Sequence, residues 1–140
     1  QAKWCAPHTA YSMAKFGMSL VVLGLSGEQR GTIAVNALWP RTTIATAAIK
    51  NLLGGDAIMH MSRKPEILAE AAYRIFHKPV SFTGNFLIDD VFLAGEGVAD
   101  FDQYRVDPSQ PLLPDFFVPD TAALPPGVSL APASAKHGLE

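Results

Sequence analysis

The chain has 140 residues, of which 49% are hydrophobic and 17% charged, and its formal net charge is −2 at pH 7. This composition supports one folded domain with a hydrophobic core, and it indicates neither a disordered chain, nor a bilayer-spanning segment, nor the basic surface of a nucleic-acid-binding protein. The single cysteine, Cys5, excludes a disulfide within the chain and is typical of a reducing compartment, so we expect a cytoplasmic protein.

The charge is uneven along the chain. Residues 1–95 contain nine basic and six acidic side chains, whereas residues 96–140 contain two basic and seven acidic ones. The later part also holds more than half of the prolines. We therefore expect a folded region over residues 1–118, followed by a Pro/Ala-rich and disordered tail over residues 119–140.

The first predicted helix runs from Thr9, its expected N-cap, to about Gln29. Apolar residues follow helical spacing along it, and a line of small residues allows another helix to approach closely. This line consists of Ala10, Ala14, Gly17 and Gly24. Tyr11 and Lys15 are four residues apart, so both side chains leave the same face of the helix.

The Tyr11–Lys15 pair is a candidate for acid–base chemistry. A free phenol titrates near about pH 10, and a neighbouring cation lowers that pKa. The pair could therefore exchange a proton with a substrate hydroxyl or carbonyl group. The spacing alone fits equally a boundary tyrosine beside a solvated lysine, so the interpretation depends on its context.

The rest of the chain predicts an α/β arrangement. Residues 32–38 have the pattern of a buried parallel strand, and the loop at residues 39–44 leaves its carboxyl end, where parallel sheets bind ligands. A short helix at residues 46–53 and a loose connection precede an amphipathic helix that has Pro65 in its first turn. Residues 80–88 predict a second strand, and Asp89-Asp90 leads into a short helix. The apolar residues of 100–118 predict that this segment wraps onto a surface or a subunit.

This order of motifs resembles the C-terminal half of a short-chain dehydrogenase/reductase. The likeness rests on Tyr-x-x-x-Lys, on a strand ending Val-Asn-Ala-Leu before a proline-led loop with threonines, and on Phe-Thr-Gly-Asn-Phe; Pro-Leu-Leu-Pro-Asp-Phe-Phe extends it to residue 117. The resemblance implies an α/β fold, the C-terminal half of a doubly wound parallel-sheet Rossmann-type domain. It also implies an oxidoreductase that uses NAD or NADP and transfers hydride between the nicotinamide and an alcohol or carbonyl substrate.

The resemblance assigns roles to individual residues. Tyr11 matches the catalytic acid/base, and Lys15 matches the lysine that lowers the tyrosine pKa and binds the nicotinamide ribose. Pro40 begins the loop whose backbone meets the nicotinamide carboxamide. The cofactor-binding residues expected from this match are Tyr11, Lys15, Pro40, Arg41, Thr42, Thr43 and Ile44. Arg41 stands where the family usually has glycine, and residues 42–64 match a mobile substrate loop. No metal site is expected.

The resemblance also implies partners. Family members pair into dimers and tetramers through the helix that carries the tyrosine, so we expect a homodimer or homotetramer. The Gly-rich pyrophosphate turn and the catalytic serine and asparagine match nothing in this chain, which would need the N-terminal half of the same domain. Apolar loop residues suggest a small apolar substrate; they are Ile44, Ile49, Leu52, Leu53 and Ile58. The alternative is a non-catalytic homologue acting as a lipid-binding or scaffolding subunit, suggested by Arg41 and the apolar segment 101–117.

Overall fold

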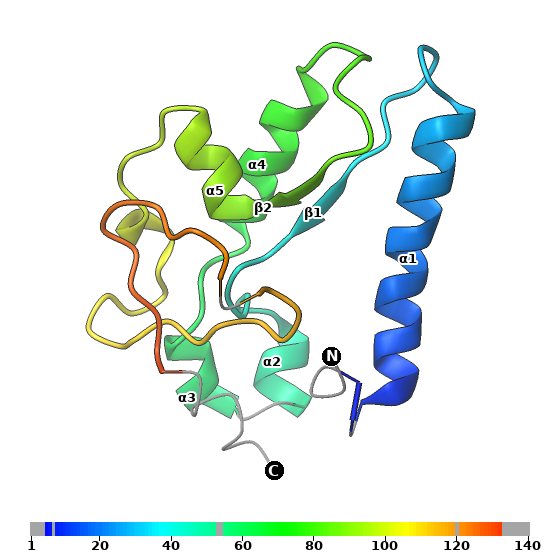
Figure 1. Ribbon diagram of the computed structural model, residues 1–140. Helices are drawn as coiled ribbons and strands as arrows, with labels where there is room; N and C mark the ends of the chain where they lie inside the picture. The colour runs from blue at the N-terminus through cyan, green and yellow to red at the C-terminus, as the bar shows by residue number, and fades with distance from the viewer. Residues whose placement is uncertain (1–4, 7, 53–54, 120, 133–140) are drawn as a thin grey trace.

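The computed structural model describes residues 5–6, 8–52, 55–119 and 121–132. These residues form helices and two short strands (Figure 1). In chain order these elements are α1 (Thr9–Glu28), β1 (Ala37–Trp39), α2 (Ala47–Leu52), α3 (Gly55–His60), α4 (Glu66–Phe76), β2 (Phe86–Ile88), α5 (Asp89–Gly95) and a 3-10 turn at Asp102–Tyr104. Leu53 and the tail beyond residue 132 lie outside the described residues. No helix in the described ranges combines the length and the apolar character needed to cross a membrane.

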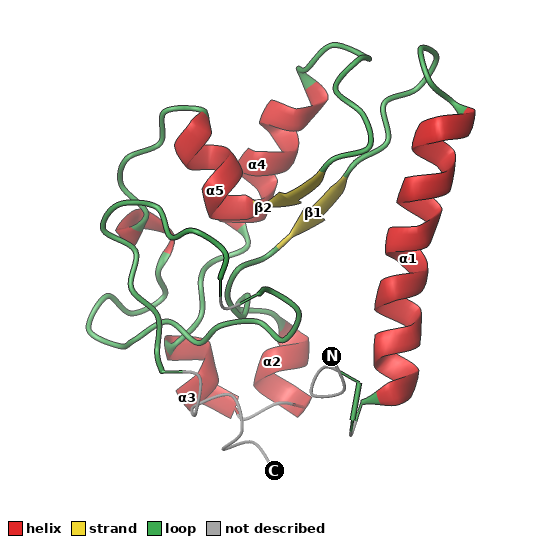
Figure 2. Ribbon diagram, viewed as in Figure 1, coloured by secondary structure: helices red, strands yellow, loops and turns green. Residues whose placement is uncertain are grey.

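The strands β1 and β2 form a parallel pair in which Ala37 aligns with Phe86 and Trp39 with Ile88. Helices α4 and α5 pack on this pair (Figure 2), which confirms the α/β class with a parallel sheet. Both strands are shorter than predicted. In the extended segments just before the two strands, side chains make hydrogen bonds that backbone groups would make in a regular ladder.

The side chains of two residues, Thr83 and Asn36, make those bonds. The Thr83 hydroxyl accepts the N–H of Val35 at 2.9 Å. The Asn36 side chain donates to the Phe82 carbonyl at 2.8 Å and accepts the N–H of Asn85 at 3.1 Å. The extended segments before β1 and β2 therefore stay aligned without forming a continuous ladder.

The two long predicted helices are confirmed, with one error at an end. His8, not Thr9, is the N-cap of α1, and no side chain caps that end. The Thr9 hydroxyl instead donates to the Cys5 carbonyl at 3.3 Å. Pro65 precedes α4 as its N-cap, and Ile67 and Ala71 on its inner face are fully buried.

The connection between β1 and α4 is more ordered than predicted. It contains α2 and α3, which pack against each other. Ile49 and Ile58 from these helices form a small buried cluster with Leu113. Helix α2 confirms the short helix predicted at residues 46–53, whereas α3 was not predicted, because its six residues are too few for a periodic pattern to identify.

The main core lies between α4, α5 and the following segment. Its buried members are Ile67, Ala71, Leu93, Phe101 and Tyr104. Segment 100–118 therefore wraps onto a surface, as predicted, and that surface belongs to the chain's own body. Farther along, Leu130 forms a parallel bridge with Leu112, and Val128 packs on the core. The domain boundary at residue 118 stays a prediction, while residues 121–132 have defined contacts with the body.

Helix α1 lies beside β1 but stands apart from the core (Figure 1). Large apolar side chains along it are exposed, including Met13 at 72%, Leu20 at 69% and Leu23 at 59%. The space between α1 and the end of β1 is the pocket described next.

Candidate active site

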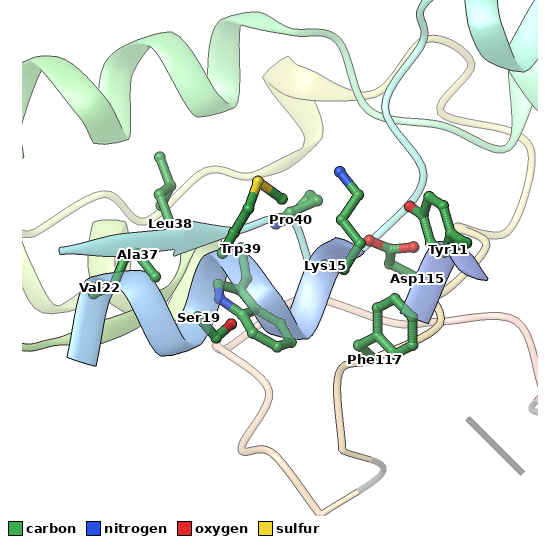
Figure 3. A pocket seen from close by; sticks show the side chains of 11 residues that line it. Tyr11, Lys15, Ser19, Val22, Ala37, Leu38, Trp39, Pro40, Asp115 and Phe117 are labelled. Atoms are coloured by element: carbon green, nitrogen blue, oxygen red, sulfur yellow. The ribbon is translucent and has the colours of Figure 1, made fainter. Parts of the chain in front are cut away.

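A pocket of about 370 Å³ opens between α1, the carboxyl end of β1 and segment 115–117. Tyr11 and Lys15 enter it from α1, and Trp39 and Pro40 enter it from the end of β1 (Figure 3). Asp115 and Phe117 close it from the C-terminal segment. The structure therefore brings together three of the predicted site residues, Tyr11, Lys15 and Pro40, at the sheet edge that parallel folds use for ligands.

Tyr11 and Lys15 are in contact. The Lys15 ammonium lies over the Tyr11 ring, 5.5 Å from its centroid. Burial raises the pKa of the Tyr11 phenol above its usual value, and the negative charge of Asp115 raises it further. Lowering of this pKa by Lys15 stays a prediction. At neutral pH the phenol holds its proton and can donate it.

Aromatic side chains form the wall next to Tyr11. The Phe117 ring stacks on Tyr11 with centroids 5.8 Å apart and meets Phe16 edge-on at 5.1 Å. Phe116 contacts His8 at 5.2 Å. These contacts attach the C-terminal segment to the start of α1. Tyr11 remains 48% exposed, so the phenol stays accessible.

Asp115 and Phe117 line the pocket but were not predicted as site residues. They lie about a hundred positions after Tyr11, and no local pattern relates the two segments. The only available signal was the Pro-Leu-Leu-Pro-Asp-Phe-Phe stretch, in which an acidic residue is flanked by apolar ones.

Arg41 was expected at the cofactor, but its side chain is directed elsewhere. It is 1% exposed, and its Nε donates to both oxygens of Asp90 at 2.7 and 2.8 Å. Its Nη2 donates to the Ala123 carbonyl at 2.6 Å. A guanidinium this deeply buried needs a carboxylate partner. Arg41 is thus a buried ion-pair residue and does not line the pocket.

The three residues after Arg41 are also turned away from the pocket. The Thr42 hydroxyl donates to the Thr43 carbonyl at 3.2 Å, and the Thr43 hydroxyl shares a 2.8 Å hydrogen bond with Ser62. Ile44 packs on the main core. The side chains of Thr42, Thr43 and Ile44 are therefore engaged within the protein, and cofactor contact by the backbone of this loop stays a prediction.

Arg41 belongs to a buried charge cluster with Arg63, Asp89 and Asp90, all at most 1% exposed. Asp90 also accepts from Arg63 Nη1 at 2.9 Å. Asp89 Oδ1 accepts the backbone N–H of Arg41 at 3.0 Å. Burial, followed by the neighbouring Asp90 charge, raises the pKa of Asp89 to about 6. The cluster joins the ends of β1 and β2 to the connection before α4.

Comparison with known proteins places these features in a family context. No known protein-family profile matches the chain. The chain is 57% identical over 115 residues to hydroxysteroid dehydrogenase-like protein 2 of Danio rerio, a match that covers 82% of this chain and 28% of that protein. It is 55% identical to the Homo sapiens protein of that name over 82% of this chain and 27% of that protein.

Solved structures agree with this likeness. A dehydrogenase from Xanthomonas campestris matches with a TM-score of 0.79 and 48% identity, over 86% of this chain and 44% of that one. A short-chain dehydrogenase from Mycobacterium thermoresistibile matches with a TM-score of 0.76 and 48% identity, over 92% of this chain and 45% of that one. The chain therefore spans less than a third of these curated relatives and less than half of these solved proteins.

Proposed function

Because the chain belongs to the short-chain dehydrogenase/reductase family, we propose that it forms the Tyr11–Lys15 part of the active site of an NAD- or NADP-dependent oxidoreductase. The substrate is an alcohol or a carbonyl compound. One observation carries this proposal: a phenol and an ammonium from one helix share a pocket at the carboxyl end of β1. Parallel α/β sheets bind ligands at that edge.

The proton chemistry follows from the state of Tyr11. A phenol titrates near about pH 10 and burial raises the pKa of Tyr11 further, so Tyr11 carries a proton that it can donate to a carbonyl oxygen during reduction. The C=O bond becomes C–H and O–H, and Tyr11 is left as a phenolate. The Lys15 cation over its ring stabilises that phenolate. In the oxidation direction the same groups accept the alcohol proton.

The donor set suits the nicotinamide end of the cofactor. Among the described residues Lys15 forms no ion pair, so its ammonium is available to a ribose hydroxyl, and Pro40 supplies an apolar contact. When bound, a reduced nicotinamide would supply the hydride to the carbonyl carbon. The pyrophosphate needs a Gly-rich turn at a helix N-terminus. We assign that role to residues outside this chain, as the sequence analysis expects.

The pocket walls suggest the class of substrate. Trp39 and Phe117 contribute aromatic side chains to the lining, and Met18 and Val22 extend it along α1. Such a lining favours a small apolar alcohol or carbonyl compound over a highly charged one. The apolar loop residues expected at the substrate add nothing to this lining: Ile44 packs on the main core, and Ile49 and Ile58 pack on Leu113.

We also propose self-association through α1. The exposed side chains of Met13, Leu20, Val21 and Leu23 form an apolar surface on this helix. Apolar surfaces of this kind are usually covered by a partner. A second copy of the chain, joined helix to helix, would cover this one.

The two observations behind the non-catalytic alternative, a lipid-binding or scaffolding homologue, each have another explanation in the fold, and the alternative stays a second candidate. Arg41 does not disturb the pocket, because Asp90 binds its side chain elsewhere. Apolar side chains of segment 101–117 pack within the chain's own core, with Phe101 at 6% and Leu112 at 2% exposure. The catalytic proposal is supported by the Tyr11–Lys15 pocket.

Cofactor binding tests the proposal. The full-length protein is titrated with NADH and with NADPH, and binding is followed by fluorescence. We expect saturable binding of one of them, weakened at least tenfold in Lys15→Met. Lys50→Met is the matched control, because Lys50 is 61% exposed on α2 and should leave binding unchanged. Absence of saturable binding of either cofactor to the wild-type protein would overturn the proposal.

A further inference from the structure

We propose that Arg41 is a positioning residue: it fastens a C-terminal strap to the loop after β1 and so holds the Phe117 ring against Tyr11. The strap is formed by residues 112–119 and 121–131. The inference rests on the proposed function only for its effect on substrate, and the attachment itself can be measured without turnover. It gives Arg41 a part in substrate selection, although Arg41 is not among the residues that line the pocket.

Arg41 holds the strap through both its backbone and its side chain. Its carbonyl oxygen accepts the N–H of Asp115 at 2.8 Å. Its Nη2 donates to the Ala123 carbonyl at 2.6 Å, and its Nη1 donates more weakly to the Ala122 carbonyl at 3.5 Å. Phe117 lies between these attachment points in the chain, so the part of the strap that carries it is held on both sides.

Backbone pairing extends this attachment along the strap. Thr42, the residue after Arg41, forms an antiparallel bridge with Pro114. At the far end, the N–H of Ala131 donates to the Leu112 carbonyl at 2.7 Å, so the two ends of the strap lie side by side. Arg41 therefore fastens the middle of a closed loop rather than a free chain end.

The guanidinium of Arg41 binds the strap and the charge cluster at the same time. Its Nε donates to both oxygens of Asp90 at 2.7 and 2.8 Å, and the residue is 1% exposed. A guanidinium carries its N–H groups in a rigid planar fork, so its Nε and its two Nη nitrogens can bind separate partners. A lysine ammonium is a single point of charge on a flexible stem. Arg41→Lys would therefore keep a positive charge near Asp90 but lose the simultaneous hold on the strap.

The Phe117 ring transmits the position of the strap to the pocket. It stacks on Tyr11 with centroids 5.8 Å apart and meets Phe16 at 5.1 Å. Figure 3 shows the ring beside Tyr11 at one end of the pocket. Tyr11 and Lys15 belong to α1 and not to the strap. Release of the strap should therefore weaken the binding of an apolar substrate and leave the proton transfer largely unchanged.

Arg41→Lys in the full-length protein tests the proposal, with Arg63→Lys as the matched control. Arg63 is also fully buried and donates to Asp90 at 2.9 Å. Within the described part of the chain, however, its side chain makes no hydrogen bond to the strap. Steady-state assays with small apolar ketones and aldehydes give KM and kcat, and hydrogen exchange followed by mass spectrometry reports how firmly the strap is held.

We expect Arg41→Lys to raise KM at least about threefold, because an aromatic contact with the substrate is weakened, while kcat stays nearly unchanged. The amides of the strap should exchange at least about tenfold faster, because charged hydrogen bonds from Arg41 are lost. Arg63→Lys should leave KM and the exchange of the strap close to those of the wild-type protein.

Phe117→Ala shows whether Arg41 acts through the ring. In a protein that already carries Phe117→Ala, Arg41→Lys should raise KM no further, because the ring that it positions is gone. Effects of the two substitutions that simply multiply would overturn the proposal.

An unchanged KM or an unchanged exchange of the strap in Arg41→Lys would likewise contradict the proposal, as would equal changes in Arg63→Lys. If Arg41→Lys does not fold, the wild-type protein decides. The amides of Asp115 and Ala131, followed by NMR, should exchange slowly, and exchange of either one as fast as in an unfolded chain would overturn the proposal. An absence of turnover would contradict the proposed function alone, since the exchange data still show whether Arg41 holds the strap.

Discussion

Asp90→Asn should strongly destabilise the protein, because Asp90 is the carboxylate that balances two buried guanidinium groups. It accepts charged hydrogen bonds at 2.7 and 2.8 Å from Arg41 and at 2.9 Å from Arg63. All three side chains are at most 2% exposed, so water cannot replace the lost charge. Asparagine keeps the shape but leaves Arg41 and Arg63 without their main counter-charge.

The size of the effect follows from this burial. Removing one partner of a buried ion pair costs about 3–5 kcal/mol, a large part of the roughly 5–15 kcal/mol that stabilises a typical domain. Glu96→Gln is the matched control: it breaks the Lys78–Glu96 pair at 2.7 Å, whose side chains are 29% and 27% exposed. A partly solvated pair contributes about 0–1 kcal/mol.

Urea denaturation of the full-length protein, followed by tryptophan fluorescence, measures both variants. We expect Asp90→Asn to lower the free energy of unfolding by at least about 3 kcal/mol, several times the effect of Glu96→Gln. If the two variants differ by less than about 1 kcal/mol, the buried cluster does not have the role described. Replacing Arg41, Arg63 and Asp90 together by apolar residues should cost much less than Asp90→Asn, because no charge is then left unpaired.

Three further outcomes follow from the same contacts. Asp89 has a raised pKa in the folded protein, so its stabilising contribution is complete below its ordinary value of 3.8 and is lost as the pH rises through about 6; Asp89→Asn should remove this pH dependence, worth about 3 kcal/mol, from unfolding curves measured between pH 4 and 8. Phe117→Ala removes the ring that stacks on Tyr11 and should raise the KM for an apolar carbonyl substrate at least threefold in steady-state assays, with a smaller effect on cofactor binding. Leu20→Lys combined with Leu23→Lys places charge on the exposed face of α1 and should shift the oligomer toward monomer in analytical ultracentrifugation, whereas Tyr73→Lys on α4 should not.

Sequence periodicity predicted the elements that form through local pattern. Helix α4 has one apolar face, and the buried Ile67 and Ala71 lie on it as expected. The parallel strands were predicted in the right places but too long, because extended apolar stretches look the same whether backbone or side chains satisfy their bonds. Asn36 and Thr83 supply those bonds here. Helix α3 was missed because a single turn and a half carries no repeating pattern.

The site was predicted only where its residues are neighbours in the chain. Tyr11 and Lys15 lie one helical turn apart, so their shared face could be predicted from spacing. The direction in which the Arg41 side chain points depends on Asp90, which lies 49 positions away in the sequence. The approach of Asp115 to Tyr11 depends on the whole path of segment 100–118. Such pairings are set by tertiary packing, and a local pattern does not reveal them.

The central claim is that Tyr11 transfers the proton in a nicotinamide-dependent reaction, and Tyr11→Phe tests it most directly. The full-length protein is assayed with its preferred cofactor and the most active substrate from a panel of small apolar ketones and aldehydes. Tyr73→Phe is the control, since Tyr73 is 64% exposed on α4, away from the pocket. We predict a loss of at least about a hundredfold in kcat for Tyr11→Phe, with cofactor binding retained and Tyr73→Phe unaffected. Turnover by Tyr11→Phe at the wild-type rate would contradict the claim.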